Sequence, residues 1–416
     1  MSRTITLYLA IAALTASLRS ASAQDMVPFE PIICYHHDYT ASAFVAAPEF
    51  FLDGTALPLS EFRFFYGDSI PALPKAAIEY AASVWETYLV SEVPIEVSVA
   101  WQPFEEENVL ASAGPTNILR DFPGAVDPEV WYPVALAESI LGENFNDDAP
   151  DIRVVINSEA NWYFGIDGNT PPGQIDMASV IMHELGHGLG FVSSSDVVED
   201  RLGALGFNGR PITYDLFLTT DGVNINDETL FPSPSEELLN VFTSNELFFD
   251  SELAAEFNGG QNPMLFAPFD YEEGSSISHL DEIAFPNGAP NALMSPFIAR
   301  GEALHDPGPI AVAMLQTMGW ETRDQITNLA EPEPVVLELF PNPAVESVQL
   351  RLSTAWQRSA TQLSLLDTRG NVLQQQRLPP GPELHRINLR HLPAGQYWLQ
   401  LEGAGKVAHR TVVVSR

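Results

Sequence analysis

The chain has 416 residues, of which 45% are hydrophobic and 10% aromatic, so it is long and apolar enough for two or three folded domains and is not a disordered protein. Its 55 acidic and 19 basic residues give a net charge of −36 at pH 7, which makes nucleic acid and anionic membrane surfaces poor partners. The single cysteine, Cys34, excludes a disulfide within the chain.

The N-terminus has the pattern of a secretory signal peptide over residues 1–23. Arg3 supplies the positive start, an apolar run follows from Ile5 to Leu14, and a small-residue cleavage site ends at Ala23. No later stretch reaches the roughly 18 apolar residues that a membrane span needs. We therefore expect a secreted or cell-surface protein, in which residues 24–58, which show no clear period, form a propeptide or an N-terminal arm.

Regular elements follow this N-terminal region. Apolar residues at period 2 predict strands, and apolar residues three or four apart predict helices. The region 103–150 is rich in proline, glycine and acids, which is typical of long loops. The predicted elements are a strand at 59–66, a helix that begins at Pro74 and runs to Leu89, strands at 94–101 and 151–157, and a helix at 177–189 with Asp176 as its N-cap.

The predicted helix at 177–189 contains the pattern His-Glu-x-x-His, formed by His183, Glu184 and His187. Residues four apart lie on one face of a helix, so the two imidazoles point the same way and can bind one metal ion. Glu184 lies beside that metal, where its carboxylate can take a proton from a water that the metal activates. This is the residue set of a zinc hydrolase, and Zn²⁺ is the cofactor we expect.

A catalytic zinc usually has three protein ligands, so a third must come from elsewhere in the chain. Gly190 lies three residues after the motif, as in the form H-E-x-x-H-x-x-G, where the helix ends and the chain turns back. The compact version of that form has a histidine three residues later, but here that position is Ser193. The downstream histidines before the C-terminal region are His279 and His305, and Glu199 is the main candidate if the third ligand is a glutamate.

Residues 195–275 are rich in Asp, Glu, Asn and Pro, which predicts an insertion of loops and short helices. His279 and Met294 follow it, and then a last helix over 309–318. The chain resembles the leishmanolysin-like branch of the metzincin metallopeptidases in the order of these features. They are H-E-x-x-H-x-x-G-F, a long insertion, a third histidine and a methionine. The resemblance covers roughly residues 60–320.

The resemblance implies an α+β fold, with a metzincin-like zinc peptidase domain over residues 59–328 that hydrolyses protein or peptide substrates as an endopeptidase. It implies that Met294 packs in a tight turn below the metal. The chain departs from the parasite enzymes because it lacks their disulfides and has Leu280 where they have a tryptophan. The zinc ligands that the resemblance implies are His183, His187 and His279, with Glu184 as the general base.

Several alternatives stay open from the sequence. The chain can be a thermolysin-type zinc peptidase with Glu199 as third ligand, or a non-catalytic surface adhesin on a peptidase fold, although an inert fold has no need of Glu184. Cys34 can be a thiolate that caps the zinc in a latent form, but a lone cysteine is more often simply buried. The acidic loops at 146–148 and 221–227 do not fit the spacing of a calcium-binding EF-hand, so we expect solvated loops there rather than calcium.

The composition changes near Glu331-Pro332-Glu333-Pro334, which predicts a stiff linker over residues 329–335. Beyond it, alternating apolar residues and a turn signal predict a small all-β sandwich over residues 336–416. This region resembles a type IX secretion sorting domain, which implies export by the type IX secretion machinery; the alternative is a generic carbohydrate-binding or adhesive β-module. The residues that carry the resemblance are Phe340-Pro341-Asn342-Pro343, Asp367-Thr368-Arg369-Gly370 and the stretch from Leu392 to Tyr397.

Overall fold

The computed structural model describes residues 25–68, 70–106, 108–146, 149–323, 338–352, 361–366, 372–379, 384–403 and 406–415. The signal peptide and the linker that the sequence predicts lie outside these described residues. The chain mixes helices and strands, with strands in the majority, and divides into two compact units, residues 1–326 and 327–416. Each unit has its own hydrophobic core. Across the described ranges, no helix is both long and apolar enough to cross a membrane.

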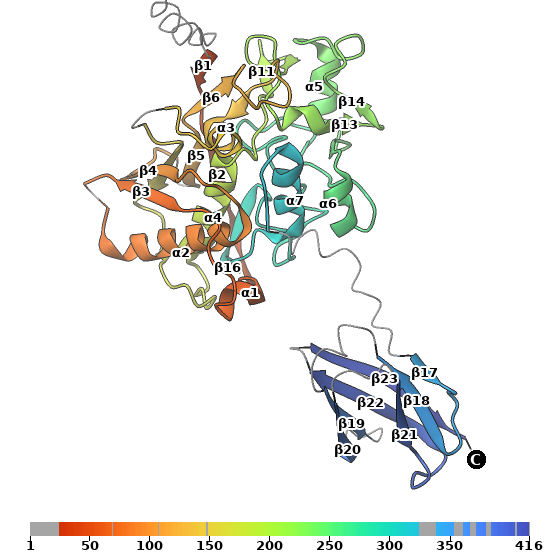
Figure 1. Cartoon of the computed structure of the whole chain (residues 1–416). Coiled ribbons are helices and arrows are strands. Elements are labelled where there is room, and N and C mark those ends of the chain that lie inside the picture. The colour runs from red at the N-terminus through yellow and green to blue at the C-terminus, as the bar shows by residue number, and fades with distance from the viewer. Residues whose placement is uncertain are drawn as a thin grey trace, which may run out of the picture. The chain divides into compact units, whose positions relative to one another are not determined.

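A six-stranded mixed sheet is the framework of the N-terminal unit (Figure 1). Its strands are β2 (Ile32–Val45), β3 (Phe62–Tyr66), β4 (Ile95–Gln102), β5 (Val109–Pro115), β8 (Ile152–Asn157) and β16 (Phe297–Leu304), in the order β16-β2-β5-β8-β4-β3. β3, β4 and β8 are parallel, whereas β5 runs antiparallel to β8. β2 then pairs antiparallel with β5 and parallel with β16. The strands expected at 59–66, 94–101 and 151–157 are thus confirmed.

Two helices, α2 (Ala72–Tyr88) and α4 (Met177–Gly188), pack against each other, and α4 also packs against the sheet (Figure 1). α4 contacts β5, β8, β2 and β16. Ala77 and Ala81 are fully buried on α2, and Trp85 donates its indole N–H to the carbonyl of Met182 at 2.9 Å. Both helices predicted from apolar spacing are confirmed, and their shared interface sets the position of the His-Glu-x-x-His motif.

The prediction of long loops over residues 103–150 is wrong. β5 lies in this region, together with β6 (Asn117–Arg120), β7 (Tyr132–Pro133) and α3 (Val134–Leu141). β5 reads Val-Leu-Ala-Ser-Ala-Gly-Pro, and all of its residues are buried. A strand that is covered on both faces shows no alternation, and small residues carry little of the β-branched signal by which strands are recognised.

The N-terminal arm is built into the sheets of this unit. β1 (Asp25–Pro28) pairs antiparallel with β6, and β2 is an internal strand of the main sheet. The short helix α1 (Glu49–Leu52) follows β2. The absence of a period over residues 24–58 therefore did not mean an absence of regular structure.

The insertion at 195–275 consists of short elements, but the expectation of loops and short helices holds only in part, because five of these elements are strands. They are the strands β11 (Asp196–Val198), β12 (Leu202–Ala204), β13 (Leu218–Thr220), β14 (Val223–Asn224) and β15 (Phe248–Phe249), the 3-10 helix η1 (Asp215–Phe217) and the helices α5 (Glu236–Phe242) and α6 (Glu252–Phe257). α6 packs against α7 (Gly308–Met318), the predicted last helix. The small strands β9 (Trp162–Tyr163) and β10 (Ile175–Asp176) precede α4.

The C-terminal unit is all-β in its described residues. One sheet has the order β17-β18-β21 and the other β20-β19-β22-β23, and a single apolar core lies in this unit. The alternating residues Val348, Leu350, Leu363 and Leu365 are fully buried, so the sequence pattern indicated the correct face. The strands are β17 (Glu338–Phe340), β18 (Ser347–Arg351), β19 (Thr361–Leu366), β20 (Val372–Leu378), β21 (Leu384–Asn388), β22 (Gly395–Gly403) and β23 (Lys406–Val414).

Candidate metal centre

The helix that carries the motif begins where the sequence predicts, because Asp176 caps it. Asp176 Oδ1 accepts hydrogen bonds from the backbone N–H of Ser179 at 2.9 Å and from its hydroxyl at 2.6 Å. The same buried carboxylate accepts a bond from the hydroxyl of Thr170 and lies 2.9 Å from His305 Nε2. The hydroxyl of Ser179 in turn accepts a bond from the N–H of Leu304, the last residue of β16, at 2.7 Å. These bonds fix the first turn of α4 to the end of β16.

The glycines within the motif make room for close packing. A Cβ at Gly186 would lie 2.7 Å from Met294 Sδ, and a Cβ at Gly188 would lie 2.3 Å from Cγ2 of Ile152 on β8. Each glycine lowers intrinsic helix propensity by about 1 kcal/mol relative to alanine, and in exchange the helix lies closer to its neighbours. Gly190 ends the helix with a φ of 117°, a conformation that side chains disfavour.

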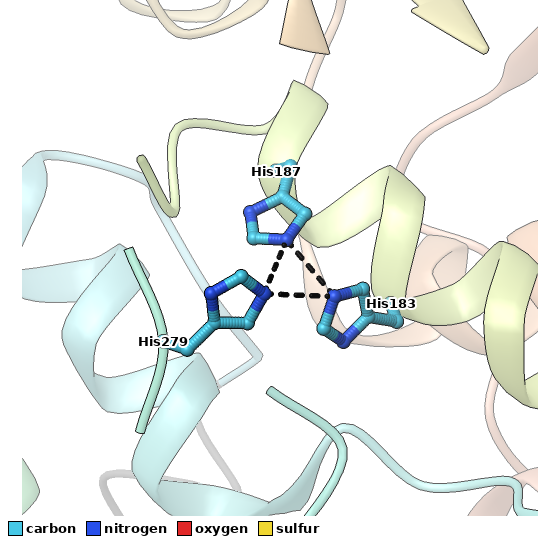
Figure 2. A group of neighbouring side chains, drawn as sticks. All are labelled: His183, His187 and His279. Atoms are coloured by element: carbon cyan, nitrogen blue, oxygen red, sulfur yellow. Dashed lines mark hydrogen bonds between the residues drawn. The ribbon is translucent and has the colours of Figure 1, made fainter. Parts of the chain in front are cut away.

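Three imidazoles converge on one point (Figure 2). His183 and His187 come from α4, and His279 comes from the segment that follows the insertion. Their Nε2 atoms, which dashed lines join in Figure 2, form a triangle with sides of 2.9 Å, 3.1 Å and 3.2 Å. A tetrahedral zinc with Zn–N bonds of roughly 2.0–2.1 Å places its nitrogens about 3.3–3.4 Å apart, so the triangle is slightly contracted but matches three ligands of one small cation.

The other nitrogen of each ring determines the tautomer. Nδ1 of His183 lies 2.7 Å from the carbonyl oxygen of Leu293, Nδ1 of His187 lies 2.7 Å from that of Phe191, and Nδ1 of His279 lies 2.7 Å from that of Ser275. A carbonyl oxygen only accepts, so each Nδ1 carries the proton and each Nε2 presents a lone pair. Three lone pairs that face one another repel unless a cation lies between them. A ring that donates its other N–H to a backbone carbonyl, as these three do, is the usual arrangement of a metal-bound histidine.

Burial keeps the three rings neutral. It lowers the pKa of His183 to about 4, and it lowers the pKa of His187 and of His279 well below the usual value. None of the three residues is more than 4% exposed. At neutral pH the rings are therefore neutral imidazoles, the form that is able to bind a metal ion, rather than imidazolium cations.

Glu184 is fully buried beside this cluster, and neither of its carboxylate oxygens has a hydrogen-bond partner within the described part of the chain. Burial raises the pKa of Glu184 well above its usual value. The ligand atoms of Glu184, His183 and Cys34 lie within 4.8 Å of one another. A buried carboxylate with free lone pairs is chemically suited to accept a proton from a group brought next to it.

The other two candidates for the third ligand, His305 and Glu199, lie elsewhere, and Ser193, at the position of the compact form's histidine, has a different partner. Ser193 donates its hydroxyl to Asp215 at 2.7 Å, and His305 is engaged with Asp176. Glu199 is exposed in the β11–β12 hairpin, where it forms an ion pair with Arg201 at 3.2 Å. The structure thus brings His279, and not Glu199 or His305, to the two histidines of the motif.

The segment of His279 is tied to the segment of Met294. The N–H of Leu280 donates to the carbonyl of Met294 at 2.8 Å, and Met294 is fully buried against Gly186. Sequence reasoning did not identify the carbonyls of Leu293 and Ser275 that orient the rings, because a backbone acceptor has no signature in sequence.

Comparisons with known families cover two stretches of the chain. Residues 338–415 match the family described as secretion system C-terminal sorting domain, and residues 131–222 match a family described as SPBPB7E8-like. The second stretch contains α4 and its motif. No curated protein matches the chain. The C-terminal unit is therefore a type IX sorting domain that interacts with the type IX secretion machinery, and the protein is secreted or held at the cell surface.

Proposed function

We propose that the N-terminal unit is a zinc-dependent endopeptidase of the metzincin type, similar to the leishmanolysin-like branch. The observation that carries the proposal is the convergence of three imidazole Nε2 atoms, all with their lone pairs inward, beside a buried carboxylate without a partner among the described residues. The order of the motif, the long insertion, His279 and Met294 supports the metzincin type. The exposed position of Glu199 speaks against the thermolysin-type alternative.

His183, His187 and His279 would hold the metal through Nε2, and the carbonyls bonded to their Nδ1 atoms keep the rings in that orientation. Zinc supplies Lewis acidity, which polarises a peptide carbonyl and makes a water nucleophilic at neutral pH. Because the surrounding residues are buried, the charges that develop in the reaction interact in a medium of low dielectric constant.

Glu184 is the general base of the proposed reaction. Its carboxylate removes a proton from the water as the water oxygen forms a bond to the peptide carbon. The same proton then passes to the amide nitrogen, so the C–N bond breaks and a neutral amine leaves. A carboxylate that accepts short hydrogen bonds would be a weaker base. Neither oxygen of Glu184 accepts one within the described residues, and the Cys34 thiol beside it lowers the pKa of this carboxyl less than burial raises it.

The test replaces Glu184 with glutamine, which removes the base but no ligand. We expect Glu184→Gln to keep its zinc and to lose about a hundred- to ten-thousand-fold in casein hydrolysis. Glu199→Gln is the matched control, because it changes an exposed glutamate outside the cluster. Activity is measured before and after limited proteolysis, with and without a chelator, and zinc content is measured by mass spectrometry. Wild-type protein that holds zinc and hydrolyses no peptide in any of these conditions would contradict the proposal and favour a binding protein on an inert fold.

A further inference from the structure

A cavity of about 310 Å³ lies where β8 ends, between the turn that follows this strand and the paired strands β2 and β16. Its walls hold the guanidinium of Arg300 from β16, the carboxylate of Glu159 and the apolar side chains of Phe104, Leu110 and Ile175. The three histidines of the candidate metal centre, which all lie in the described ranges, do not line it. Sites for small molecules have volumes of roughly 300–1,000 Å³, so this cavity is large enough for a ligand.

The backbone of β16 aims Arg300 into this cavity. The pairing of β16 with β2 is irregular both before and after this residue. The next residue, Gly301, has a φ of 82° and donates its N–H to the carbonyl of Gln174 at 2.8 Å. A Cβ at Gly301 would lie 2.5 Å from the carbonyl oxygen of Ala41, so the position requires glycine. Irregularities of this kind re-aim a side chain and are frequent beside functional sites.

The guanidinium of Arg300 is held in place but is not neutralised. Its Nη1 donates to the carbonyl of Gly173 at 3.2 Å, and its Nη2 donates to His36 Nε2 at 3.3 Å. Among the described residues Arg300 forms no ion pair with a carboxylate, although the chain has 55 acidic and only 19 basic residues. A guanidinium has more N–H donors than these two bonds use, and its planar fork matches a carboxylate.

The wall opposite this arginine is fixed by a buried amide. Asn157 is 3% exposed, and its Nδ2 donates to the carbonyl of Val109 at 2.7 Å. Its Oδ1 accepts the N–H of Glu159 at 3.0 Å, and its own carbonyl accepts the indole N–H of Trp162 at 2.7 Å. A cavity whose walls are already ordered saves a ligand the cost of ordering them.

We propose that this cavity binds a small ligand in which a carboxylate lies next to an apolar side chain. Arg300 would bind the carboxylate through its remaining N–H groups, and this would give the cation the counter-charge that the described residues do not supply. The side chain of the ligand would pack on Leu110 and Ile175, which are fully buried, and on Phe104. This binding goes beyond the proposed peptidase activity and does not depend on it.

Two sources supply this chemistry, namely the C-terminus of a peptide and a free amino acid. A free amino acid also carries an ammonium group, and Glu159 lines the same cavity with the charge that would attract it. Arg300 and Glu159 do not form an ion pair with each other, so both charges remain available to a ligand with two opposite charges.

The first test compares ligands on the full-length wild-type protein by isothermal titration calorimetry. N-acetyl-leucine should bind, and N-acetyl-leucine amide, which lacks the carboxylate, should bind at least about tenfold more weakly. N-acetyl-glycine, which lacks the apolar side chain, should also bind about tenfold more weakly. Leucine that binds more tightly than N-acetyl-leucine would identify a free amino acid as the ligand, and equal or weaker binding would identify a peptide C-terminus. If the amide or N-acetyl-glycine binds as tightly as N-acetyl-leucine, or if no carboxylate binds at millimolar concentration, the proposal is wrong.

The second test assigns the carboxylate to its partner. Arg300→Gln should lower the affinity for N-acetyl-leucine by about tenfold or more and leave the weak binding of the amide unchanged. Arg153→Gln is the matched control, because Arg153 is an exposed arginine of β8 that does not line the cavity. Thermal unfolding checks that each variant is folded. Unchanged affinity in folded Arg300→Gln would overturn the proposal. If this variant does not fold, Arg300→Lys takes its place, because it keeps the charge and loses only the planar fork.

Discussion

Replacing His279 with alanine would remove one of the three proposed zinc ligands and leave two histidines on a single helix. Changing a group that merely orients a metal ligand already lowers affinity by about 10–100-fold. Loss of the ligand itself should therefore lower zinc affinity by more than about 100-fold, which corresponds to about 2.7 kcal/mol. His279 is fully buried with its Nδ1 bonded to the carbonyl of Ser275, so no other side chain can move into its place without rearranging that segment.

His305→Ala is the matched control, because His305 is equally buried and also lies near α4. Its Nε2 lies 2.9 Å from Asp176 Oδ1, and its Nδ1 lies 3.3 Å from the hydroxyl of Tyr80. Its loss should cost about 1–3 kcal/mol of folding stability, because it leaves buried polar groups with fewer partners. Zinc affinity should stay unchanged, since none of these atoms belongs to the histidine cluster.

The assay is competition for zinc with a fluorescent chelator, together with thermal unfolding with and without zinc. Zinc at 100 times its dissociation constant stabilises a protein by about 2.7 kcal/mol, so it should raise the unfolding temperature of wild type and of His305→Ala. It should raise that of His279→Ala little or not at all. Equal zinc affinity of His279→Ala and wild type would refute the assignment of the third ligand, and loss of zinc in His305→Ala would show that the control site is part of the centre.

Three further predictions test other parts of the structure. Gly188→Ala should lower stability by about 1–3 kcal/mol, although alanine favours helix, because its Cβ would lie 2.3 Å from Cγ2 of Ile152; urea unfolding measures this. Burial and the charge of Glu138 raise the pKa of Asp151 to about 7 in the folded chain. Between its lower pKa in the unfolded chain and this value, the folded chain holds a proton that the unfolded chain has already released. The free energy of unfolding should therefore fall as the pH rises from 5 to 8. Glu138→Gln should make that fall smaller, and equal slopes for the two proteins would contradict the account. Deletion of residues 336–416 should leave the purified N-terminal unit folded and able to bind zinc, because the two units have separate cores. The same deletion should stop export of the protein. A truncated protein that is still secreted would contradict the role of the sorting domain.

Local sequence patterns predicted the motif helix well, and the structure gives the reason. Asp176 caps the helix with its own side chain, Gly190 ends it with a positive φ, and both act within a few residues. Neither prediction required knowledge of distant contacts. β5 was missed because its Ala, Ser and Gly residues form a strand only through pairing on both edges, with β2 and β8.

The third member of the histidine cluster shows the limit of spacing arguments. His279 lies 92 residues after His187, and nothing local marks it as a partner of the motif. The small number of downstream histidines limited the choice, and the resemblance to a family order selected one. The contact between His305 and Asp176 was equally unpredictable from sequence, because Asp176 lies 129 residues earlier and has the pattern of an ordinary helix cap.

The same geometry links the metal to the stability of the N-terminal unit. The rings of His183, His187 and His279 are each held by a backbone carbonyl of a different segment, so one ion would connect α4, the turn at Phe191 and the segments at Ser275 and Leu293. Without a cation, three buried acceptors face one another, and a buried acceptor without a donor costs about 1–3 kcal/mol. Part of the free energy of metal binding to such a site therefore adds to the free energy of unfolding of the unit that contains it. Chelation should therefore lower the unfolding temperature of the N-terminal unit and leave that of the sorting domain unchanged, because the three ligands all belong to the first core's unit.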